Sequence, residues 1–397
     1  MADHSTKASA PIYTTKYKPH PTEKMQAAQW MGTKSVKIAD VPKPTITAPK
    51  DAIVRPGDIL GHEAIGYIQD VGPEVQNFQA GDRVIILPVI ACGECFYCQK
   101  KEYSLCDRTN PSEAMDSLYG HRLSGIFGYS HLTGGYSGDQ AEFCRVPNAD
   151  IVLIKCPEDM AAKKALALAD VTDTAWHGVE LAEVSEGDVV GVWGCGPIGL
   201  SIQKLSKEIR GAKKVYAIDK DPHRLKIAES HGMIAVDASK VKADDYILSL
   251  EPHGLDRAIE ASGFRSTDSA AHKAMRATGL EGDSADTVAE VIKATRKGGN
   301  VALIGDFFFN TNMFPIGMLM EKTITLRGGQ LFAQKQYFPF LMDLVTQGKY
   351  DPSFVFTKVD NFENIPQEYD MQFHQKVDGG LKSIMVTPYG RQLDQPL

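Results

Sequence analysis

The sequence has no long apolar run, no excess of basic residues and no apolar amino-terminal leader. No apolar segment approaches the ~20 residues that a membrane-spanning helix needs, so we expect no membrane partner. The 43 Lys and Arg residues are outnumbered by 50 Asp and Glu residues, which leaves no electrostatic footprint for nucleic acid or an anionic membrane. Residues 1–24 contain no apolar h-region and no Arg, which argues against a secretory or transit peptide. We therefore predict a solvated, flexible tail over residues 1–24 of a cytoplasmic protein.

Cysteine is also scarce, with seven residues among 397. In the cytosol these thiols are expected to stay reduced, so a cluster of them indicates a metal or redox site rather than disulfides. The hydrophobic fraction of 43% and the charged fraction of 23% are ordinary for a globular protein and exclude a disordered, collagen-like or coiled-coil chain. The length predicts two to three domains.

The pattern of apolar and polar residues in the sequence changes at about residue 158. Before that point, short apolar runs alternate with turn residues, which predicts an antiparallel, barrel-like β domain over residues 25–157. Over residues 158–327, compact apolar runs such as VVGVW alternate with helical patterns, which predicts a doubly wound parallel sheet. One such helix is expected over 284–297, with Thr295 on its apolar face. Residues 328–397 return to a pattern typical of β strands and are expected to complete the first domain.

A glycine-rich turn follows the first of these apolar runs. Gly194, Gly196 and Gly199 form GxGxxG, and Pro197 and Ile198 open the helical segment behind it. In this fingerprint the first Gly permits a tight turn, the second lets the backbone approach a pyrophosphate, and the third lets helix and strand pack closely. The helix N-terminus supplies N–H groups to the phosphates. The turn predicts a dinucleotide site, the alternative being a turn that serves packing alone.

An acid at the end of the next predicted strand indicates which dinucleotide. Asp219 lies 20 residues beyond Gly199, where a carboxylate accepts hydrogen bonds from a ribose 2′-OH and repels a 2′-phosphate. Arg224 and Lys220 are cations close by in the sequence. We predict NAD rather than NADP, with Asp219 and Arg224 in the cofactor site.

Four of the seven cysteines lie within fifteen residues, in ACGECFYCQKKEYSLC over residues 91–106. The two-residue gaps between Cys92, Cys95 and Cys98 suit one side of a metal ion, and Cys106 can close a tetrahedron. A bacterial iron–sulfur run would have a shorter last gap and a Pro after the last Cys. We predict a closed, structural zinc site in a lobe over residues 88–110; the alternative is four clustered structural thiols.

Together these motifs resemble the zinc-containing medium-chain alcohol dehydrogenase family. GHEAIGYIQDVGPEVQNFQAGDRV (61–84), the cysteine lobe and GVWGCGPIGL carry the resemblance, and YGHRLSGIFGYSHLTGGYSGDQAEFCRVP (119–147) is similar to the glutathione-independent formaldehyde dehydrogenase branch. The resemblance implies an α/β fold with a Rossmann domain inserted in a GroES-like β-rich catalytic domain. It also implies an oxidoreductase that acts on a small alcohol or aldehyde, and a homo-oligomer.

In that branch a second, catalytic zinc is held by Cys, His and Asp. The resemblance places His62 and Asp170 at the His and Asp positions, Glu63 beside them, and Thr174 at the nicotinamide. The family's Cys-Gly-[Ser/Thr]-Asp-x-His block has no counterpart, because this chain joins Arg55 directly to Pro56 where the block belongs. The proton-relay residues of the block are lost with it. His62, Asp170 and Glu63 still offer one nitrogen and two carboxylates; the alternatives are a hydrogen-bonded structural His62 and an Asp170 that caps a helix.

Two functions of different classes follow. The first is an NAD-dependent zinc oxidoreductase that transfers hydride between a small alcohol or aldehyde hydrate and NAD, impaired in this form by the missing segment. The second is a catalytically inactive NAD-binding homologue, or the product of alternative splicing or a mistaken gene structure. The Arg55–Pro56 join discriminates between them, because it removes chemistry and spares the dinucleotide domain. The sequence gives neither the substrate, the direction of reaction nor the subunit number.

Overall fold

The computed structural model divides the chain into two compact units. It describes residues 18–32, 35–55, 60–263, 275, 277, 282–329, 334–373 and 380–393. The first unit combines Met1–Asp170 with Phe332–Leu397, and the second is Val171–Leu331. The division falls later than residue 158 because helix α4 (Ala162–Ala169) packs on strands of the first unit. Of the expected tail, residues 1–17 lie outside the described residues, and the last seven residues belong to the first strand.

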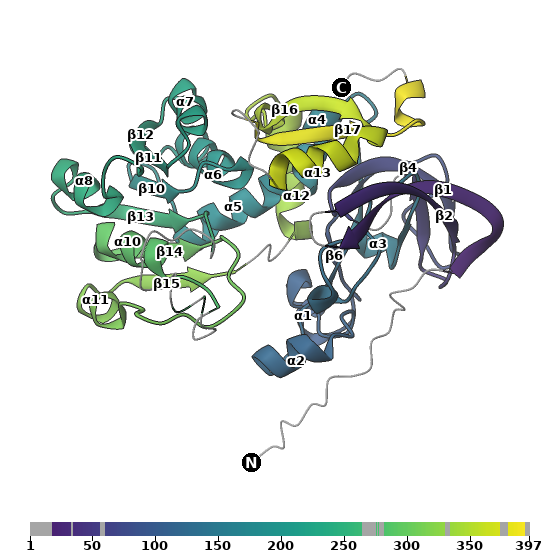
Figure 1. Cartoon of the computed structure of the whole chain (residues 1–397), viewed down its shortest axis with the longest axis horizontal. Coiled ribbons are helices and arrows are strands. Elements are labelled where there is room, and N and C mark those ends of the chain that lie inside the picture. The colour runs from purple at the N-terminus through teal and green to yellow at the C-terminus, as the bar shows by residue number, and fades with distance from the viewer. Residues whose placement is uncertain are drawn as a thin grey trace, which may run out of the picture. The chain divides into compact units, whose positions relative to one another are not determined.

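Antiparallel pairing dominates the first unit. A five-stranded antiparallel sheet has the order β8-β3-β4-β5-β9, and its strands are β3 (Ala52–Arg55), β4 (Ala64–Val71), β5 (Arg83–Ile86), β8 (Cys144–Val146) and β9 (Leu153–Lys155). Three two-stranded sheets accompany it: β1 (Lys18–Gly32) with β2 (Ser35–Thr45), β6 (Val89–Ile90) with β7 (Gly125–Ile126), and β16 (Phe356–Asn361) with β17 (Lys382–Val386). Figure 1 shows β1 and β2 as the long purple hairpin.

The register at β3 bears on the Arg55–Pro56 join. The β3–β4 pairing runs from Ala52 opposite Val71 to Arg55 opposite Tyr67, where β3 ends. On its other side β4 pairs with β5 nearer to its amino end, from Tyr67 opposite Arg83 to Ala64 opposite Ile86. The first residues of β4 therefore extend beyond the end of β3. Pro56 itself lies outside the described residues.

The carboxyl-terminal segment belongs to the first unit. Its helices are α12 (Gln334–Thr346) and α13 (Ile365–Phe373), which join the earlier α1 (Phe96–Gln99), α2 (Glu113–Tyr119), α3 (Ala149–Val152) and α4. Phe362 and Ile365 share a buried core with Met25 and Val41 of the β1–β2 hairpin. The two ends of the chain are thus held together by apolar burial, the main favourable term in folding.

The second unit contains a six-stranded parallel sheet of order β12-β11-β10-β13-β14-β15. Its strands are β10 (Val189–Trp193), β11 (Lys214–Asp219), β12 (Ile234–Asp237), β13 (Leu255–Glu260), β14 (Thr295–Leu303) and β15 (Thr325–Gly328). In chain order this is 3-2-1-4-5-6, the doubly wound arrangement in which dinucleotides bind where the order reverses. That point lies between β10 and β13, and the fold class expected from the sequence is confirmed.

Helices accompany the parallel sheet, with α5 packed on α6 and α10 on α8. They are α5 (Val171–Ala182), α6 (Pro197–Glu208), α7 (Pro222–Ser230), α8 (Ala243–Leu250), α10 (Asp286–Ala294) and α11 (Ile316–Glu321). The helix expected over 284–297 is α10, but Thr295 begins β14 instead. Its hydroxyl donates to the Val291 carbonyl oxygen at 2.7 Å, which satisfies an acceptor at the end of the helix.

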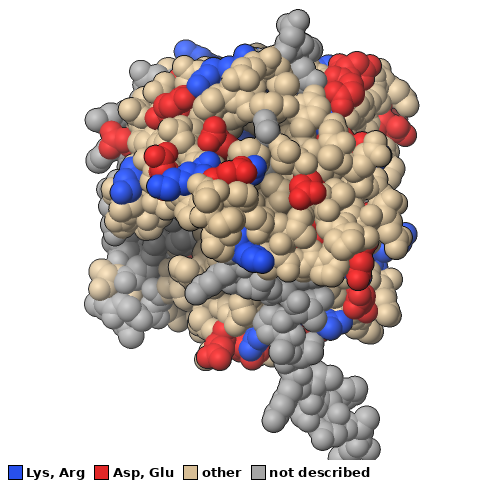
Figure 2. Space-filling view, turned by 90° about the vertical axis from the view of Figure 1, so that its right-hand side faces the viewer, with Lys and Arg blue, Asp and Glu red and all other residues tan. Residues whose placement is uncertain are grey.

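Among the described residues, no helix combines the length and the apolar character that crossing a bilayer requires. The face of the molecule in Figure 2 carries small groups of basic and acidic side chains close to one another, rather than one extended area of a single sign. This agrees with the near balance of 43 basic and 50 acidic residues.

Candidate metal and cofactor sites

The four clustered cysteines form a compact group of sulfurs. All four are buried, and their Sγ atoms lie within 4.8 Å of one another. The Cys92–Cys98 and Cys95–Cys106 sulfur pairs are 3.8 and 3.9 Å apart. A zinc ion with Zn–S bonds of about 2.3 Å requires sulfurs about 3.8 Å apart at the corners of a tetrahedron. The residues present therefore fit a tetrahedral metal ion.

Backbone donors surround these sulfurs. Cys92 Sγ accepts from the amides of Glu94 and Cys95 at 3.3 and 3.2 Å, and the Cys92 amide donates to Cys106 Sγ at 3.4 Å. Hydrogen bonds from the Cys106 and Cys98 thiols, with those amides, hold the pKa of Cys92 far below its usual range. Hydrogen bonds with the Cys106 and Cys92 thiols, together with burial, raise the pKa of Cys98. Donors to sulfur favour the thiolate, which is the form that binds metal.

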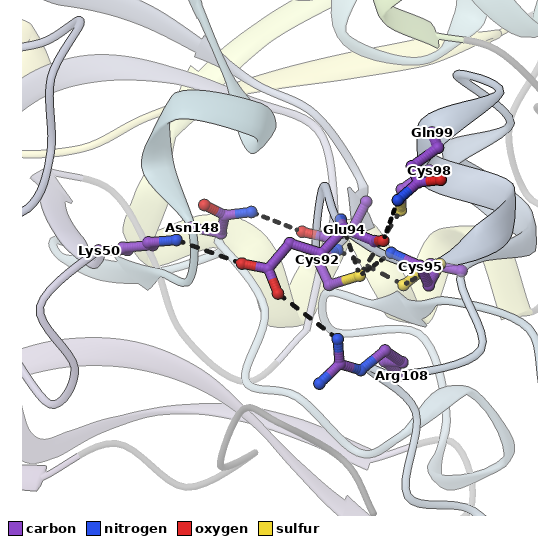
Figure 3. Close-up of polar contacts among 10 residues, drawn as sticks. Lys50, Cys92, Glu94, Cys95, Cys98, Gln99, Arg108 and Asn148 are labelled. Atoms are coloured by element: carbon purple, nitrogen blue, oxygen red, sulfur yellow. Dashed lines mark hydrogen bonds and ion pairs between the residues drawn. The ribbon is translucent and has the colours of Figure 1, made fainter. Parts of the chain in front are cut away.

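The rim of the lobe is fixed to the rest of the first unit by polar contacts. Glu94 lies between two cations, 3.5 Å from Lys50 Nζ and 3.5 Å from Arg108 Nη1 (Figure 3). Asn148, whose φ is 51°, donates from its side chain to the Ala91 carbonyl oxygen at 3.0 Å. The chain just before the first cysteine is thereby tied to the segment that leads into α3.

A second group of possible metal ligands consists of His62, Glu63 and Asp170, whose donor atoms also lie within 4.8 Å of one another. His62 Nε2 is 3.7 Å from Asp170 Oδ2 and 3.9 Å from Glu63 Oε1. Nitrogen and oxygen ligands on one tetrahedral zinc lie about 3.4 Å apart, so this group fits a metal after shifts of a few tenths of an ångström. Asp170 also occupies the C-cap position of α4, the structural alternative considered from the sequence.

Charge also connects this group. Burial lowers the pKa of His62, but the hydrogen bond and charge of Asp170, with the charges of Glu63 and Asp139, outweigh burial and raise it. Asp139 is 4% exposed, and burial raises its pKa to about 7, an effect that His62 opposes. Sequence reasoning missed Asp139, because nothing in the GDQAEF segment distinguishes it from a surface acid.

Lys382, in β17, was also missed from the sequence. Its ammonium forms an ion pair with Glu63 Oε1, across 319 residues of sequence. The other oxygen of Glu63 is buried and has no hydrogen-bond partner among the described residues. Because Lys382 pairs with Glu63, a metal ion would compete with this ammonium group for the Glu63 carboxylate.

In the second unit, the glycine-rich turn has the geometry that its spacing predicts. Gly194 has a φ of 107°, in the region that glycine favours. A Cβ on Gly199 would lie 2.0 Å from the Gly194 carbonyl oxygen, whereas a Cβ on Gly196 would meet nothing within 4 Å. Gly196 is the N-cap of α6 without a side-chain cap, and Pro197 opens the helix, followed by Ile198. The space beside Gly196, at the amino terminus of α6, is therefore open, as the approach of a pyrophosphate to a helix N-terminus requires.

Asp219 ends β11 next to this turn. Its Oδ2 accepts from the Cys195 amide at 2.6 Å, and its Oδ1 accepts from the amides of Lys220 and Asp221 at 2.7 and 2.9 Å. These bonds fix the carboxylate at the carboxyl end of the strand. Arg224 instead pairs with Asp221, the N-cap of α7, at 3.6 Å. The structure thus places Asp219 at the glycine turn and gives Arg224 a structural partner.

The remaining residues considered from the sequence are Thr174, His177 and His121. Thr174 is buried in α5 of the second unit. His177 is buried in the same helix, and burial lowers its pKa to about 4, which agrees with a structural role. His121 is exposed and stacks on Tyr119, with ring centroids 6.3 Å apart.

Comparisons with known proteins identify the family. Residues 33–158 match the alcohol dehydrogenase GroES-like domain. A zinc-type alcohol dehydrogenase-like protein of Schizosaccharomyces pombe is 41% identical over 93% of both chains. The glutathione-independent formaldehyde dehydrogenase of Pseudomonas aeruginosa is 32% identical over 63% of this chain and 60% of that protein.

Among solved structures, alcohol dehydrogenase TADH from Thermus sp. ATN1 superposes with a TM-score of 0.77 at 27% identity, covering 91% of this chain and all of that one. The order of the parallel strands, the two ligand clusters and the extent of these matches agree with one another. The chain therefore belongs to the zinc-type medium-chain alcohol dehydrogenase family of oxidoreductases.

Proposed function

We propose that the chain is a zinc-containing, NAD-dependent oxidoreductase of the alcohol and formaldehyde dehydrogenase type, in a form whose catalytic metal site lacks one ligand. The observation that carries this proposal is the contrast between the two ligand clusters. Four buried thiols stand at tetrahedral spacing in one, whereas the other offers one imidazole and two carboxylates, and one of those carboxylates is paired with Lys382.

The two clusters would have different roles. Four protein ligands leave no open coordination position, so zinc among Cys92, Cys95, Cys98 and Cys106 would be structural. His62 and Asp170, completed by a thiolate from the absent block, would hold the catalytic ion, which would polarise the substrate oxygen, while NAD would accept the hydride. Within the first unit, His62 Nε2 and Asp170 Oδ2 are 3.7 Å apart, and zinc binding would require the neutral imidazole of His62.

The missing ligand is supported by the extent of two alignments. The comparison with the S. pombe relative runs over 395 positions, although 93% of this 397-residue chain is only about 369 residues. The comparison with a zinc-type relative from Bacillus subtilis runs over 387 positions and 91% of this chain, or about 361 residues. Each alignment thus contains about 26 positions that this chain lacks. A gap of that size suits loss of the Cys-Gly-[Ser/Thr]-Asp-x-His block and its loop between Arg55 and Pro56.

We further propose that the cofactor is NAD and that the substrate is a small alcohol or aldehyde hydrate. We propose that the enzyme is a homo-oligomer and works in the cytoplasm. The Asp219 carboxylate at the glycine turn supports the choice of NAD, since it accepts hydrogen bonds from a ribose diol and repels a phosphate. The similarity to a formaldehyde dehydrogenase supports the substrate class. The proton-relay residues belong to the absent block, so this form is expected to have little or no activity.

Restoring the block tests the proposal. The 397-residue chain is compared with a chain that carries Cys-Gly-Thr-Asp and its loop between Arg55 and Pro56, and with a matched control whose inserted Cys is Ser. NADH formation from formaldehyde and from short alcohols is measured together with zinc per chain. We expect two zinc ions and turnover in the restored chain alone, and one zinc ion in the other two.

Two results would count against this account. Equal turnover by the short and restored chains, with two zinc ions in each, would show that another group has replaced the thiolate. Turnover by none of the three, with NADH bound by all, would favour the second candidate, a catalytically inactive nucleotide-binding homologue. A misplacement of about 1 Å at the reacting centre can lower the rate roughly a hundredfold. The assay must therefore detect turnover that is about a hundredfold slower than that of the restored chain.

A further inference from the structure

A buried carboxylate lies in the second unit where the order of the parallel strands reverses. Glu260 is the last residue of β13, and it has no exposed surface. Its neighbours in the sheet are Trp193 of β10 on one side and Leu303 of β14 on the other. Burying a charged group costs free energy unless it has polar partners. The partners of Glu260 therefore indicate why a carboxylate is placed there.

Glu260 holds the turn that follows its own strand, residues 261–263. Its Oε1 accepts from the amides of Ser262 and Gly263 at 3.0 and 2.9 Å, and the Ser262 hydroxyl also donates to it. Burial raises the pKa of Glu260, whereas these donors lower it. Three donors converge on one oxygen, so the carboxylate fixes the backbone of this turn.

The turn over residues 261–263 is packed between the ends of the two neighbouring strands. A Cβ on Gly194, in the glycine-rich turn after β10, would lie 2.8 Å from the Ala261 carbonyl oxygen. A Cβ on Gly263 would lie 3.1 Å from the backbone nitrogen and oxygen of Asp306, which follows β14. Contacts as close as these leave no room for another side chain. The conformation of the turn is thus coupled to both neighbouring segments.

The position of this turn relates it to one half of the dinucleotide. β11, which ends at Asp219, and β13 flank β10 on opposite sides (Figure 1). In the proposed function, Asp219 binds the ribose of the adenosine half, and the pyrophosphate lies at the amino terminus of α6 beside Gly196. Because the two halves are joined through the pyrophosphate, the nicotinamide half extends to the other side of β10, over the carboxyl ends of β13 and β14. This half carries the hydride that the reaction transfers.

We propose that Glu260 is a positioning residue for the nicotinamide half of NAD, which acts by holding residues 261–263 in the conformation that supports this half. The inference rests on the cofactor of the proposed function. A turn that is fixed before binding needs no ordering when the cofactor binds, which is the advantage of a preorganised site. Ordering a single backbone residue at binding would lower the affinity by about tenfold. The alternative is a carboxylate that only completes the end of a strand.

The test compares Glu260→Met, which removes both carboxylate oxygens from a side chain of similar length, with Glu260→Gln, which retains one oxygen as an acceptor. Dissociation constants are measured for NADH by its fluorescence and for ADP by calorimetry, since ADP carries adenosine and pyrophosphate without the nicotinamide half. Glu260→Met should bind NADH about tenfold more weakly and bind ADP as the unmodified chain does. Glu260→Gln should recover most of the NADH affinity.

A second variant disturbs the carboxylate without removing it. A Cβ on Gly305 would collide with Glu260 Oε2, so Gly305→Ala should displace the carboxylate and lower the affinity for NADH but not for ADP. Gly317→Ala is the matched control, because a Cβ on Gly317 would meet nothing within 4 Å. This control should bind both ligands as the unmodified chain does.

The comparison of the two ligands separates positioning from a merely structural role. Equal losses of NADH and ADP affinity in Glu260→Met and Gly305→Ala would overturn the proposal, and so would unchanged NADH affinity in both. Gly305→Ala decides between these outcomes where Glu260→Met does not fold. An unmodified chain that binds no NADH would refute the proposed cofactor and this inference with it, whereas a normal NADH complex in both variants would refute this inference alone.

Discussion

Replacing Cys98 with Ser should detach the metal from the cysteine lobe and open the lobe locally. The buried core of the lobe consists of Ala91 and the four cysteines, with Tyr97, Tyr103 and Ile151 only partly buried against them. Few apolar side chains are therefore present to hold residues 92–106 together without a metal. Lobes of this kind depend on metal binding for their folding free energy.

The expected magnitude follows from the ligand set. Structural zinc contributes roughly 10–16 kcal/mol in peptide sites, so one of four ligands corresponds to roughly 3 kcal/mol, or about a hundredfold in zinc affinity. Cys98 Sγ is 3.8 Å from Cys92 Sγ, and a hydroxyl there would neither bind zinc as tightly nor replace the sulfur contacts. The loss should stay local, because the glycine turn and Asp219 belong to the other unit.

Three measurements check this prediction. Elemental analysis should find one zinc ion per unmodified chain, and Cys98→Ser should lose it to a chelator at a concentration that leaves the unmodified chain loaded. Trypsin should cut faster after the exposed Lys100 and Lys101 of the variant, with NADH binding unchanged. Cys156→Ser, at a buried thiol outside the cluster, is the control and should behave as the unmodified chain. A metal-free unmodified chain, or iron with sulfide in place of zinc, would refute the reasoning.

Three further predictions follow from other parts of the structure. Asp219→Ala should reduce the ratio of NADH affinity to NADPH affinity by about tenfold or more, since a charge-assisted hydrogen bond contributes roughly 1.5–3 kcal/mol. Equal affinities of the unmodified chain for NADH and NADPH would contradict the role given to Asp219. Arg145→Met removes the counter-charge of the buried Asp51 carboxylate, which Arg145 Nε contacts at 2.8 Å and to which the Thr47 and Ala48 amides also donate. The substitution should lower the free energy of unfolding by about 3 kcal/mol in urea titrations. A change below about 1 kcal/mol would show that the ion pair is dispensable. Burial lowers the pKa of His177 to about 4, so its contribution to the free energy of unfolding is present above about pH 6.5 and is lost as the pH falls toward 4. This loss, on the order of 3 kcal/mol, should be smaller in His177→Gln. Identical dependences of the unfolding free energy on pH in the two chains would contradict the prediction.

The sequence by itself determined the features that depend on local spacing. The intervals between Cys92, Cys95, Cys98 and Cys106 predicted a group of sulfurs at tetrahedral distances, because short gaps limit how far apart such side chains can lie. GxGxxG after an apolar strand predicted the close approach of Gly199 to Gly194, since only glycine permits it. The alternation of apolar runs and helical patterns predicted the parallel sheet, and the motifs predicted the family. The helix boundary near Thr295 was wrong by a few residues, because a hydroxyl bond and a strand partner decided it.

Only the tertiary structure decided the contacts made by residues far apart in the chain. Lys382 meets Glu63 across 319 residues, and no local pattern in either segment indicates the pair. From the sequence, Asp139 resembles any acidic residue of a surface loop. It is buried near His62 because its loop packs against Gly61, where the Asp139 amide donates to the Gly61 carbonyl oxygen at 3.1 Å. The sequence predicted a missing block between Arg55 and Pro56, but it did not predict which distant acids and cations surround His62. Strand pairing and burial are long-range, so the folded chain alone sets the electrostatics of the second cluster.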